Sequence, residues 1–520
     1  MRKENVILDK LFIDKRVQKI CKEFDDAFEQ KNLIRIKKNF KSALGLLNSE
    51  LDEISKCNLY YSIGTAHGDY IQIGINKLSD KEIEYNLEQS FFYLRKAVDL
   101  IEENDIPREI SIKVYTNLGN LFDEVNRRNE GIECYKKALE IYPNFAMANG
   151  NLGMAIFLYS RIIYDNSHQV ILDHEAYKYL KKSFQDKRNL FDYAEKDFNN
   201  YCSQIERVYT KEFLDNSLTF DDFPILDEEE RKYRQWCAQN SLFLNPLNDI
   251  LDNNVVWRDI MHLPNMIMNV KDEQKMRFFG LMNEIKQEYI SSRYLFYESI
   301  QPRETEHFSD RENHLVDSFD FAIYSIYNYK MRMTFRSLYS ILDKVAFFLN
   351  EYFEIGIKEY DVNYKSIWYI AKKKANGEII YKYNNPIKEK INNNWGLYGI
   401  YWIYKDFIEG KKTSPNPKIT EISKIRNSLE HKYLKTILTI GEVKILKEKQ
   451  KSFDDKLAYY ISTEELYDIV LFLLKTIRSL IINLICCINI EERKKCEEAN
   501  KEHKFIPPLN TYPIDEGLKF

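Results

Sequence analysis

Apolar residues recur along this chain with the three- and four-residue spacing of helices, and few stretches alternate as half-buried strands do. Gly and Pro, at 16 and 12 of 520 residues, are scarce, which also favours helix over sheet. The longest helical patterns lie at 272–300, 324–356, 419–440 and 463–495. We therefore predict an all-α chain whose later half forms one helical bundle, with a loop-containing insertion at about 356–418.

A shorter pattern at 112–145 places small and large residues at fixed spacing. Its positions are Tyr115, Leu118, Gly119, Phe122, Gly131, Tyr135, Ala138 and Pro143. They match the tetratricopeptide consensus, in which small residues let two antiparallel helices approach and large ones fill the gap. Leu152 and Gly153 restart the pattern, and an imperfect earlier copy runs from Ile63 to Ala97. We expect at least three stacked repeats over about 40–210, which either bind a partner or ligand or only support the next domain.

Composition shifts suggest the domain boundaries. An acidic stretch at about 215–230 contains a proline and lacks a clear helical period, which marks a boundary. The sequence after it is rich in Asn, Trp and Pro and is typical of an ordered connector. We predict N-terminal tetratricopeptide-like repeats over 1–215, a connector over 216–270, the helical bundle over 271–495 and an irregular tail over 496–520.

The same patterns favour a cytoplasmic protein that does not cross a membrane. The most apolar run, 466–490, is interrupted by Lys475 and Arg478, which favours a buried helix over a membrane span. The first residues are charged throughout and do not resemble a signal peptide. The eight cysteines form no C-x-x-C pair, as expected for reduced thiols in the cytoplasm.

Charge is distributed unevenly. Between residues 356 and 450, nineteen Lys and Arg face ten Asp and Glu, so this region carries +9 and the rest of the chain −13. A surface for a polyanion would therefore lie in this region. On charge alone, a solvated basic face is an equal alternative.

The pattern at 419–440 also contains candidate chemistry. On a helical wheel, four residues form the core-facing stripe: Ile422, Ile425, Leu429 and Tyr433. His431 points the opposite way, Asn427 is its neighbour one turn earlier, and Arg426 lies at the edge of the stripe. The competing interpretation is an ion pair between Arg426 and Glu430, with His431 as an ordinary surface residue.

The sequence RNSLEHKY at 426–433 resembles the R-x4-H-x-Y signature of the HEPN ribonucleases. Sequence blocks from about 225 to 495 are similar to a bacterial subfamily in which a HEPN domain follows tetratricopeptide repeats. The resemblance implies cleavage of RNA without a metal or other cofactor. It also implies pairing of two HEPN domains around one cleft, because one helix places Arg426 and His431 about 140° apart.

The residue types fit that chemistry. The imidazole of His431 could take a proton from a ribose 2′-hydroxyl, because histidine changes charge near neutral pH. Arg426 could hold the scissile phosphate, and Asn427 could orient the phosphate or the imidazole. Attack by the 2′-oxygen would give a 2′,3′-cyclic phosphate, so DNA would not be a substrate.

Two further residues are candidates for this cleft. Tyr433 falls inside the apolar stripe, which favours a packing role. In HEPN toxins with nucleotidyltransferase antitoxins, however, the matching tyrosine accepts inhibitory nucleotides, which makes Tyr433 a regulatory candidate. Asp343 is a polar residue within an apolar helix and either lines the cleft or caps a buried network.

The resemblance suggests an effector of a bacterial anti-phage or toxin-like defence system. In this interpretation the HEPN dimer cuts RNA, and the repeats respond to a protein trigger or an antitoxin. The alternative is a non-catalytic adaptor or dimerisation scaffold that binds a partner protein or a nucleotide. Cleavage that is lost on replacing His431 would separate the two.

Overall fold

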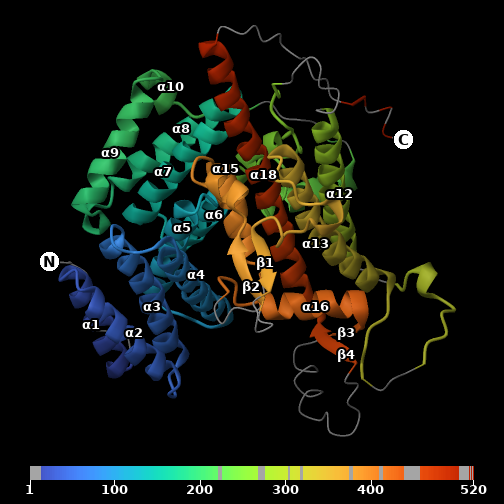
Figure 1. Cartoon of the computed structure of the whole chain (residues 1–520), viewed down its shortest axis with the longest axis horizontal. Helices are drawn as coiled ribbons and strands as arrows, with labels where there is room; N and C mark the ends of the chain where they lie inside the picture. Colours follow the sequence, from blue (N-terminus) through green and yellow to red (C-terminus); the bar gives the residue numbers. More distant parts are fainter. Residues whose placement is uncertain are drawn as a thin grey trace. The chain divides into compact units, whose positions relative to one another are not determined.

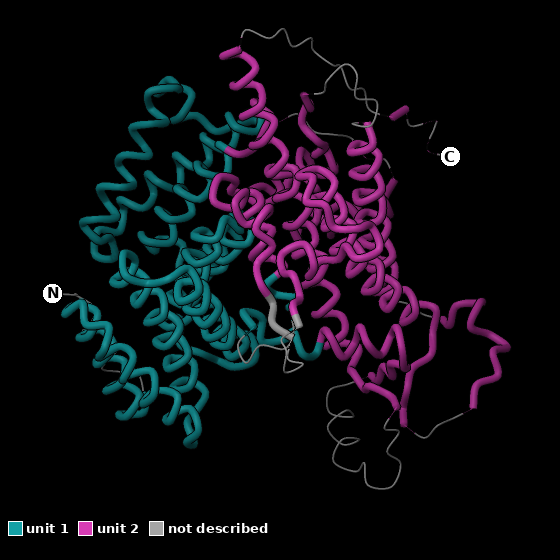
Figure 2. The backbone as a smooth tube through the Cα atoms, viewed as in Figure 1, with its two compact units in different colours: residues 1–161, 167–219, 405–421 teal, residues 162–166, 220–404, 422–520 magenta. Residues whose placement is uncertain are grey.

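The computed structural model describes residues 13–220, 225, 227–267, 276–301, 305–316, 320–373, 379–408, 414–438, 457–502, 514–515, 517 and 519. The chain divides into two compact units (Figure 2). Unit 1 contains residues 1–161, 167–219 and 405–421, and unit 2 contains 162–166, 220–404 and 422–520. Each unit is made of several separate segments of the chain, so the two units do not correspond to the predicted domains. The predicted domain limits therefore stay predictions.

Unit 1 is built from consecutive helices (Figure 1). They are α1 (Lys15–Glu29), α2 (Leu33–Leu47), α3 (Glu53–Gly74), α4 (Asp80–Glu103), α5 (Arg108–Glu124), α6 (Arg128–Ile141), α7 (Ala146–Ile162), α8 (Asn166–Ser183), α9 (Asp192–Glu206) and α10 (Lys211–Asp215). Side chains fix several of the helix starts. At α4, for example, Ser79 and Glu82 form a capping box, which satisfies backbone N–H groups of the first turn.

Close helix contacts occur where the repeat pattern predicts them. A Cβ atom on Gly119 would lie 2.6 Å from the ring of Tyr135, and one on Gly153 would lie 2.7 Å from Leu180. In the earlier copy, the Ser90 hydroxyl donates a hydrogen bond to the carbonyl oxygen of Gly64 at 2.8 Å. The small residues therefore allow the paired helices α3–α4, α5–α6 and α7–α8 to approach closely, which agrees with three repeats.

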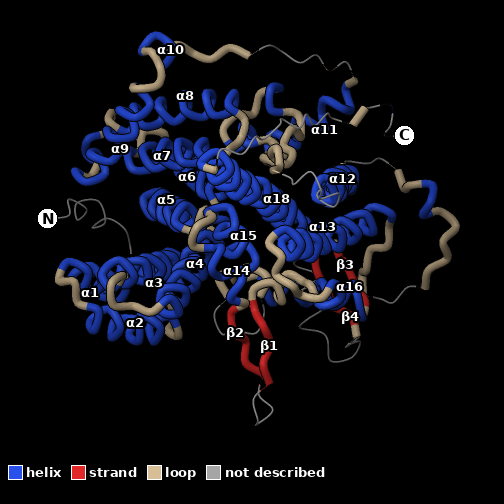
Figure 3. Tube along the Cα trace, turned by 45° about the horizontal axis from the view of Figure 1, so that its top comes forward, coloured by secondary structure: helices blue, strands red, loops and turns tan. Residues whose placement is uncertain are grey.

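Unit 2 is a helical bundle with two small sheets (Figures 1 and 3). Its elements are α11 (Glu228–Gln239), α12 (Arg277–Ser299), α13 (Ile326–Tyr352), β1 (Tyr369–Lys373), β2 (Ile379–Tyr383), α14 (Asn385–Ile391), α15 (Trp395–Lys405), α16 (Ile419–His431), β3 (Tyr433–Ile437), β4 (Ala458–Ser462) and α18 (Thr463–Lys501). Helix α12 packs on α13, and α18 packs on both of them. The predicted helical architecture is therefore confirmed.

Helix α18 is the core helix of this bundle. Its length and composition would allow it to cross a membrane, but 83% of its most apolar window is buried inside the protein. The buried Arg478 on this helix is neutralised by Asp249, with 2.5 Å between Nη1 and Oδ1. A guanidinium held by a protein carboxylate agrees with the expectation of a buried helix.

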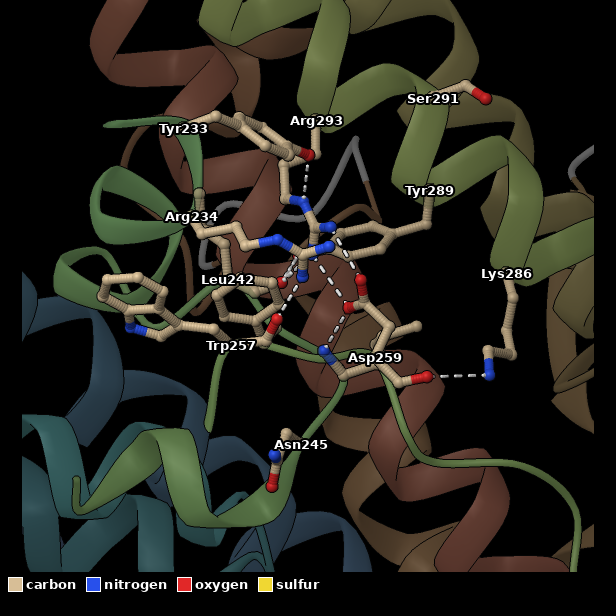
Figure 4. A network of polar contacts seen from close by, with 12 residues as sticks. Tyr233, Arg234, Leu242, Asn245, Trp257, Asp259, Lys286, Tyr289, Ser291 and Arg293 are labelled. Carbon is tan, nitrogen blue, oxygen red and sulfur yellow. Dashed lines mark hydrogen bonds and ion pairs between the residues drawn. The ribbon is translucent and has the colours of Figure 1, made fainter. Parts of the chain in front are cut away.

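The segment before α12 is held by a second buried guanidinium (Figure 4). Arg293 on α12 donates to both carboxylate oxygens of Asp259, at 2.9 and 2.7 Å, and to the carbonyl oxygen of Leu242 at 2.9 Å. Burial raises the pKa of Asp259, but the charge of Arg293 and its hydrogen bonds outweigh that effect and hold this pKa below its usual value. The ion pair and the hydrogen bond to Leu242 thus join the irregular stretch between α11 and α12 to α12.

The prediction of one helix over 419–440 is wrong beyond His431. Helix α16 ends there, and the chain continues as β3, which pairs in parallel with β4, with Tyr433 opposite Ala458. A further backbone contact supports the strand, because the N–H of Ile323 donates to the carbonyl oxygen of Thr436 at 2.7 Å. Pairing with a strand more than twenty residues later overrides the helical pattern of this sequence.

Candidate active site

Arg426 lies on α16 and faces α13. Its guanidinium carbon is 4.8 Å from the centre of the Tyr339 ring, within the range of a cation–π contact. The Tyr339 hydroxyl is in turn 3.1 Å from the hydroxyl of Tyr364. The predicted alternative partner of Arg426, Glu430, contacts a different cation, since its Oε1 is 3.4 Å from Nε of Arg336 on α13. The guanidinium of Arg426 is thus oriented by an aromatic face.

Asp343 lies on α13 close enough to Arg426 to interact with its charge. Burial raises the pKa of this carboxyl, while the backbone N–H of Tyr364, at 2.9 Å, and the positive charge of Arg426 oppose the rise. The two roles predicted for Asp343, lining the cleft and capping a buried network, stay predictions.

His431 and Asn427 are both exposed. His431 is the last residue of α16, so its imidazole stands at the end of the helix and is accessible to solvent. Within the described part of the chain, no hydrogen bond or ion pair involves this ring. The outward presentation agrees with the helical wheel, and the catalytic role of the ring stays a prediction.

Tyr433 does not lie in the apolar stripe, so the packing role predicted for it is wrong. It is the first residue of β3, and 40% of it is exposed. Ile422 and Ile425 are fully buried, as the stripe predicts, whereas Leu429 is only partly buried. The helix ends before Tyr433, so the 3.6-residue period no longer decides which way this ring points. Its accessible phenol leaves the regulatory interpretation as a prediction.

Two further arginines approach the predicted site from α13, and the sequence pattern had not singled them out. Arg336 contacts Glu430, the neighbour of His431 in the chain. Arg332, one turn earlier, donates from Nη2 to the Thr436 hydroxyl at 2.9 Å, and burial lowers its pKa. Their four-residue spacing places both on one face of α13, but only the packing of α13 on α16 and β3 shows what that face meets.

Together these contacts define the Arg–His region: Arg332, Arg336, Tyr339 and Asp343 on α13, with Arg426, Asn427 and His431 on α16. Three guanidinium groups and one accessible imidazole are suited to bind phosphate oxygens and to transfer a proton.

The sequence profile of LA2681-like HEPN domains matches residues 269–491, and that of the tetratricopeptide repeat matches 112–145. Residues 269–491, the HEPN domain, are thus similar to this family over somewhat less than half of the chain. No curated protein and no solved structure matches the chain. The HEPN domain contains every residue of the Arg–His region and follows the matched repeat, so the predicted order of repeats and HEPN domain is confirmed. HEPN domains commonly belong to ribonucleases and related effectors, so the Arg–His region is the candidate active site.

Proposed function

We propose that the HEPN domain is a metal-independent endoribonuclease. The observation that carries this proposal is the exposed imidazole of His431 at the end of α16, with Arg426 on the same helix and Arg336 held against Glu430 beside it. A base, a phosphate-binding cation and open access for a polymer are the minimum that cleavage of RNA through its own 2′-hydroxyl requires.

The reaction needs no external oxidant, reductant or cofactor. His431 removes the proton of the 2′-hydroxyl, and the 2′-oxygen forms a bond to phosphorus. The bond from phosphorus to the 5′-oxygen breaks, and the leaving oxygen receives a proton from an imidazolium or from water. Arg426 and Arg336 stabilise the charge that develops on the non-bridging oxygens, and Asn427 orients the phosphate or the ring. The products are a 2′,3′-cyclic phosphate and a 5′-hydroxyl end.

Two copies of the chain are part of this proposal. Arg426 and His431 are separated by about 140° around their helix, so one copy does not readily place both against one phosphate. A twofold pair of HEPN domains would bring a second set of these residues to the same cleft. Arg336 supplies a cation beside Glu430, the neighbour of His431 in the same chain. The second copy therefore does not have to supply every cation that binds the phosphate.

The test is cleavage of RNA in EDTA by the purified full-length protein. We expect His431→Ala to abolish cleavage and His314→Ala, which removes another exposed histidine of unit 2, to leave it unchanged. An RNA with 2′-deoxyribose at the cleaved position should resist, because it lacks the attacking oxygen. Cleavage that persists in His431→Ala would rule out the proposed site. A protein that cuts no RNA, alone or with its trigger, would favour the non-catalytic adaptor.

We further propose that the protein is a cytoplasmic effector of bacterial defence, in which the repeats sense a protein trigger or an antitoxin. The support is that the chain combines a tetratricopeptide repeat, a class of repeat that forms binding surfaces, with a HEPN domain, a class of domain common in effectors. Expression of the unaltered chain in bacteria should then arrest growth in the presence of the trigger, and His431→Ala should not. Equal growth arrest by both proteins would contradict an effector role based on RNA cleavage.

A further inference from the structure

A short segment of the HEPN domain packs as part of the repeat unit. Residues 405–421 belong to unit 1, although 220–404 before them and 422–520 after them belong to unit 2 (Figure 2, teal). The segment joins α15 to α16. Because α16 begins at Ile419, the first turn of the helix that carries Arg426 and His431 lies in this segment.

The segment is anchored by the buried carboxylate of Asp406. Arg95 on α4 donates to both of its oxygens, at 2.6 and 2.8 Å, and Arg127 at the start of α6 donates to one of them at 2.7 Å. The Asp406 side chain is fully buried, and the side chains of Arg95 and Arg127 are 12% and 1% exposed. Burial raises the pKa of Asp406, but Arg127 and Arg95 outweigh that effect and hold it below its usual value, so the group is ionised.

A second contact strengthens the anchor at the neighbouring residue. The ammonium of Lys405 is 2.5 Å from a carboxylate oxygen of Glu88 and also pairs with Glu84, both on α4. The segment therefore presents a cation and an anion in sequence, and the repeat unit supplies the opposite charge to each. Such matched pairing is specific to this segment, since a neutral peptide would leave several buried charges unpaired.

The anchor reaches the first turn of α16 through a short series of hydrogen bonds. Arg95 also donates to the carbonyl oxygen of Pro415, at 3.0 Å. The side chain of Asn416 donates to the carbonyl oxygen of Asp406 at 3.4 Å, and the N–H of Ile419 donates to the carbonyl oxygen of Asn416 at 3.3 Å. One arginine thus ties Asp406 to the residues that begin α16.

We propose that Asp406 is a positioning residue through which the repeat unit holds α16 in order. A buried ion pair of this kind is either formed or broken, because an unpaired charge in the interior is unfavourable. A ligand that repacks α4 against α6 would separate Arg95 from Arg127 and release the segment. The amino end of α16 would then lose the hydrogen bonds that join it to Arg95 and Asp406. The consequence for RNA cleavage rests on the function proposed above, whereas the effect on the order of α16 does not.

The test is amide hydrogen exchange on the full-length protein. Asp406→Asn removes the charge and keeps the shape, and Arg95→Lys keeps the charge but loses the two-pronged contact. We expect exchange over 419–431 to become at least about tenfold faster in both variants, with α12 unchanged. The control is Glu102→Gln, which breaks an exposed ion pair with Lys137 in the same unit and should change neither region.

The outcomes separate the two proposals. Unchanged exchange of α16 in Arg95→Lys would overturn the positioning role, even if Asp406→Asn does not fold, and so would equal loosening of α12 and α16. Faster exchange of α16 together with slower RNA cleavage by Arg95→Lys would support it. If α16 loosens as expected but His431→Ala still cuts RNA, the positioning role stands and the proposed active site does not.

Discussion

The guanidinium carbon of Arg426 lies 4.8 Å from the centre of the Tyr339 ring. The two residues are on different helices, α16 and α13, so this contact fixes both the direction of the arginine and the packing of the helix that carries His431. An aromatic face holds a guanidinium without occupying its hydrogen-bond donors, which stay available for phosphate oxygens.

The contact predicts different outcomes for two substitutions of Tyr339. Tyr339→Leu removes the ring, and we expect kcat/KM for RNA to fall about three- to tenfold, the equivalent of the usual 0.5–1 kcal/mol or slightly more of a cation–π contact. Tyr339→Phe keeps the ring and loses the hydroxyl contact with Tyr364, so it should stay near the unaltered activity. Equal losses in both variants would show that the hydroxyl, and not the ring, is important.

Arg336 is predicted to bind the phosphate backbone of RNA. Arg336→Gln should weaken binding to RNAs of different sequence to a similar extent and should reduce the slope of log K against log salt by about 1, the value of one phosphate contact. Lys344→Gln removes a cation from the same helix, but its ammonium pairs closely with two carboxylates, at 2.8 and 2.6 Å, whereas the contact of Arg336 with Glu430 is longer, at 3.4 Å, so the slope should change less. Filter binding or fluorescence anisotropy at several salt concentrations with the His431→Ala protein measures both. The same slope for Arg336→Gln and Lys344→Gln would contradict this assignment.

His67 in unit 1 should make stability depend on pH. Burial lowers the pKa of its imidazole from 6.5 to about 4, against the opposing hydrogen bond with Asn86 at 2.7 Å. Below pH 6.5 the unfolded chain takes up a proton that the folded ring does not, so stability falls as the pH falls through this window. The loss contributed by His67 between pH 7.5 and pH 5 is about 2 kcal/mol.

Thermal unfolding at these two pH values measures this contribution. In His67→Gln the difference between the two melting temperatures should shrink, because the substituted side chain does not titrate. The ring is also stacked on Phe40, with 4.0 Å between ring centres, so the variant loses some stability at both pH values. An unchanged difference would show that other groups cause the pH dependence.

The close approach of α5 and α6 predicts that one methyl group added at Gly119 destabilises the protein. A Cβ atom on Gly119 would lie 2.6 Å from the Tyr135 ring, which is buried and whose hydroxyl donates a hydrogen bond to Asn120, so Gly119→Ala should destabilise unit 1 by about 1–3 kcal/mol. Gly68→Ala on α3 is the matched control. Apart from its chain neighbours and the backbone of its own helix, no atom of the described residues lies within 4 Å of its added Cβ, and alanine favours helix by about 0.5–1 kcal/mol. The free energy of unfolding, measured with denaturant, should therefore fall in Gly119→Ala and rise in Gly68→Ala. A stabilising Gly119→Ala would contradict the described packing.

The sequence by itself determined features that depend on residues close together in the chain. The spacing in 112–145 predicts a helical repeat, because small and large residues must alternate at the contact of two adjacent helices. The same local period places Ile422 and Ile425 inside and His431 outside. Lys475 and Arg478 predict a buried protein helix at 463–495, and α18 is buried, with Arg478 paired with Asp249. In each case the period of a helix converts sequence position into direction.

Only the tertiary structure decided the features that depend on distant partners. The end of α16 and the exposure of Tyr433 follow from the pairing of β3 with β4. Glu430 contacts Arg336 and not Arg426, its partner in the competing interpretation, and Asp406 lies against Arg95, more than three hundred residues away. A charged or strand-forming side chain has many possible partners of similar energy, and the packing of the whole chain selects among them.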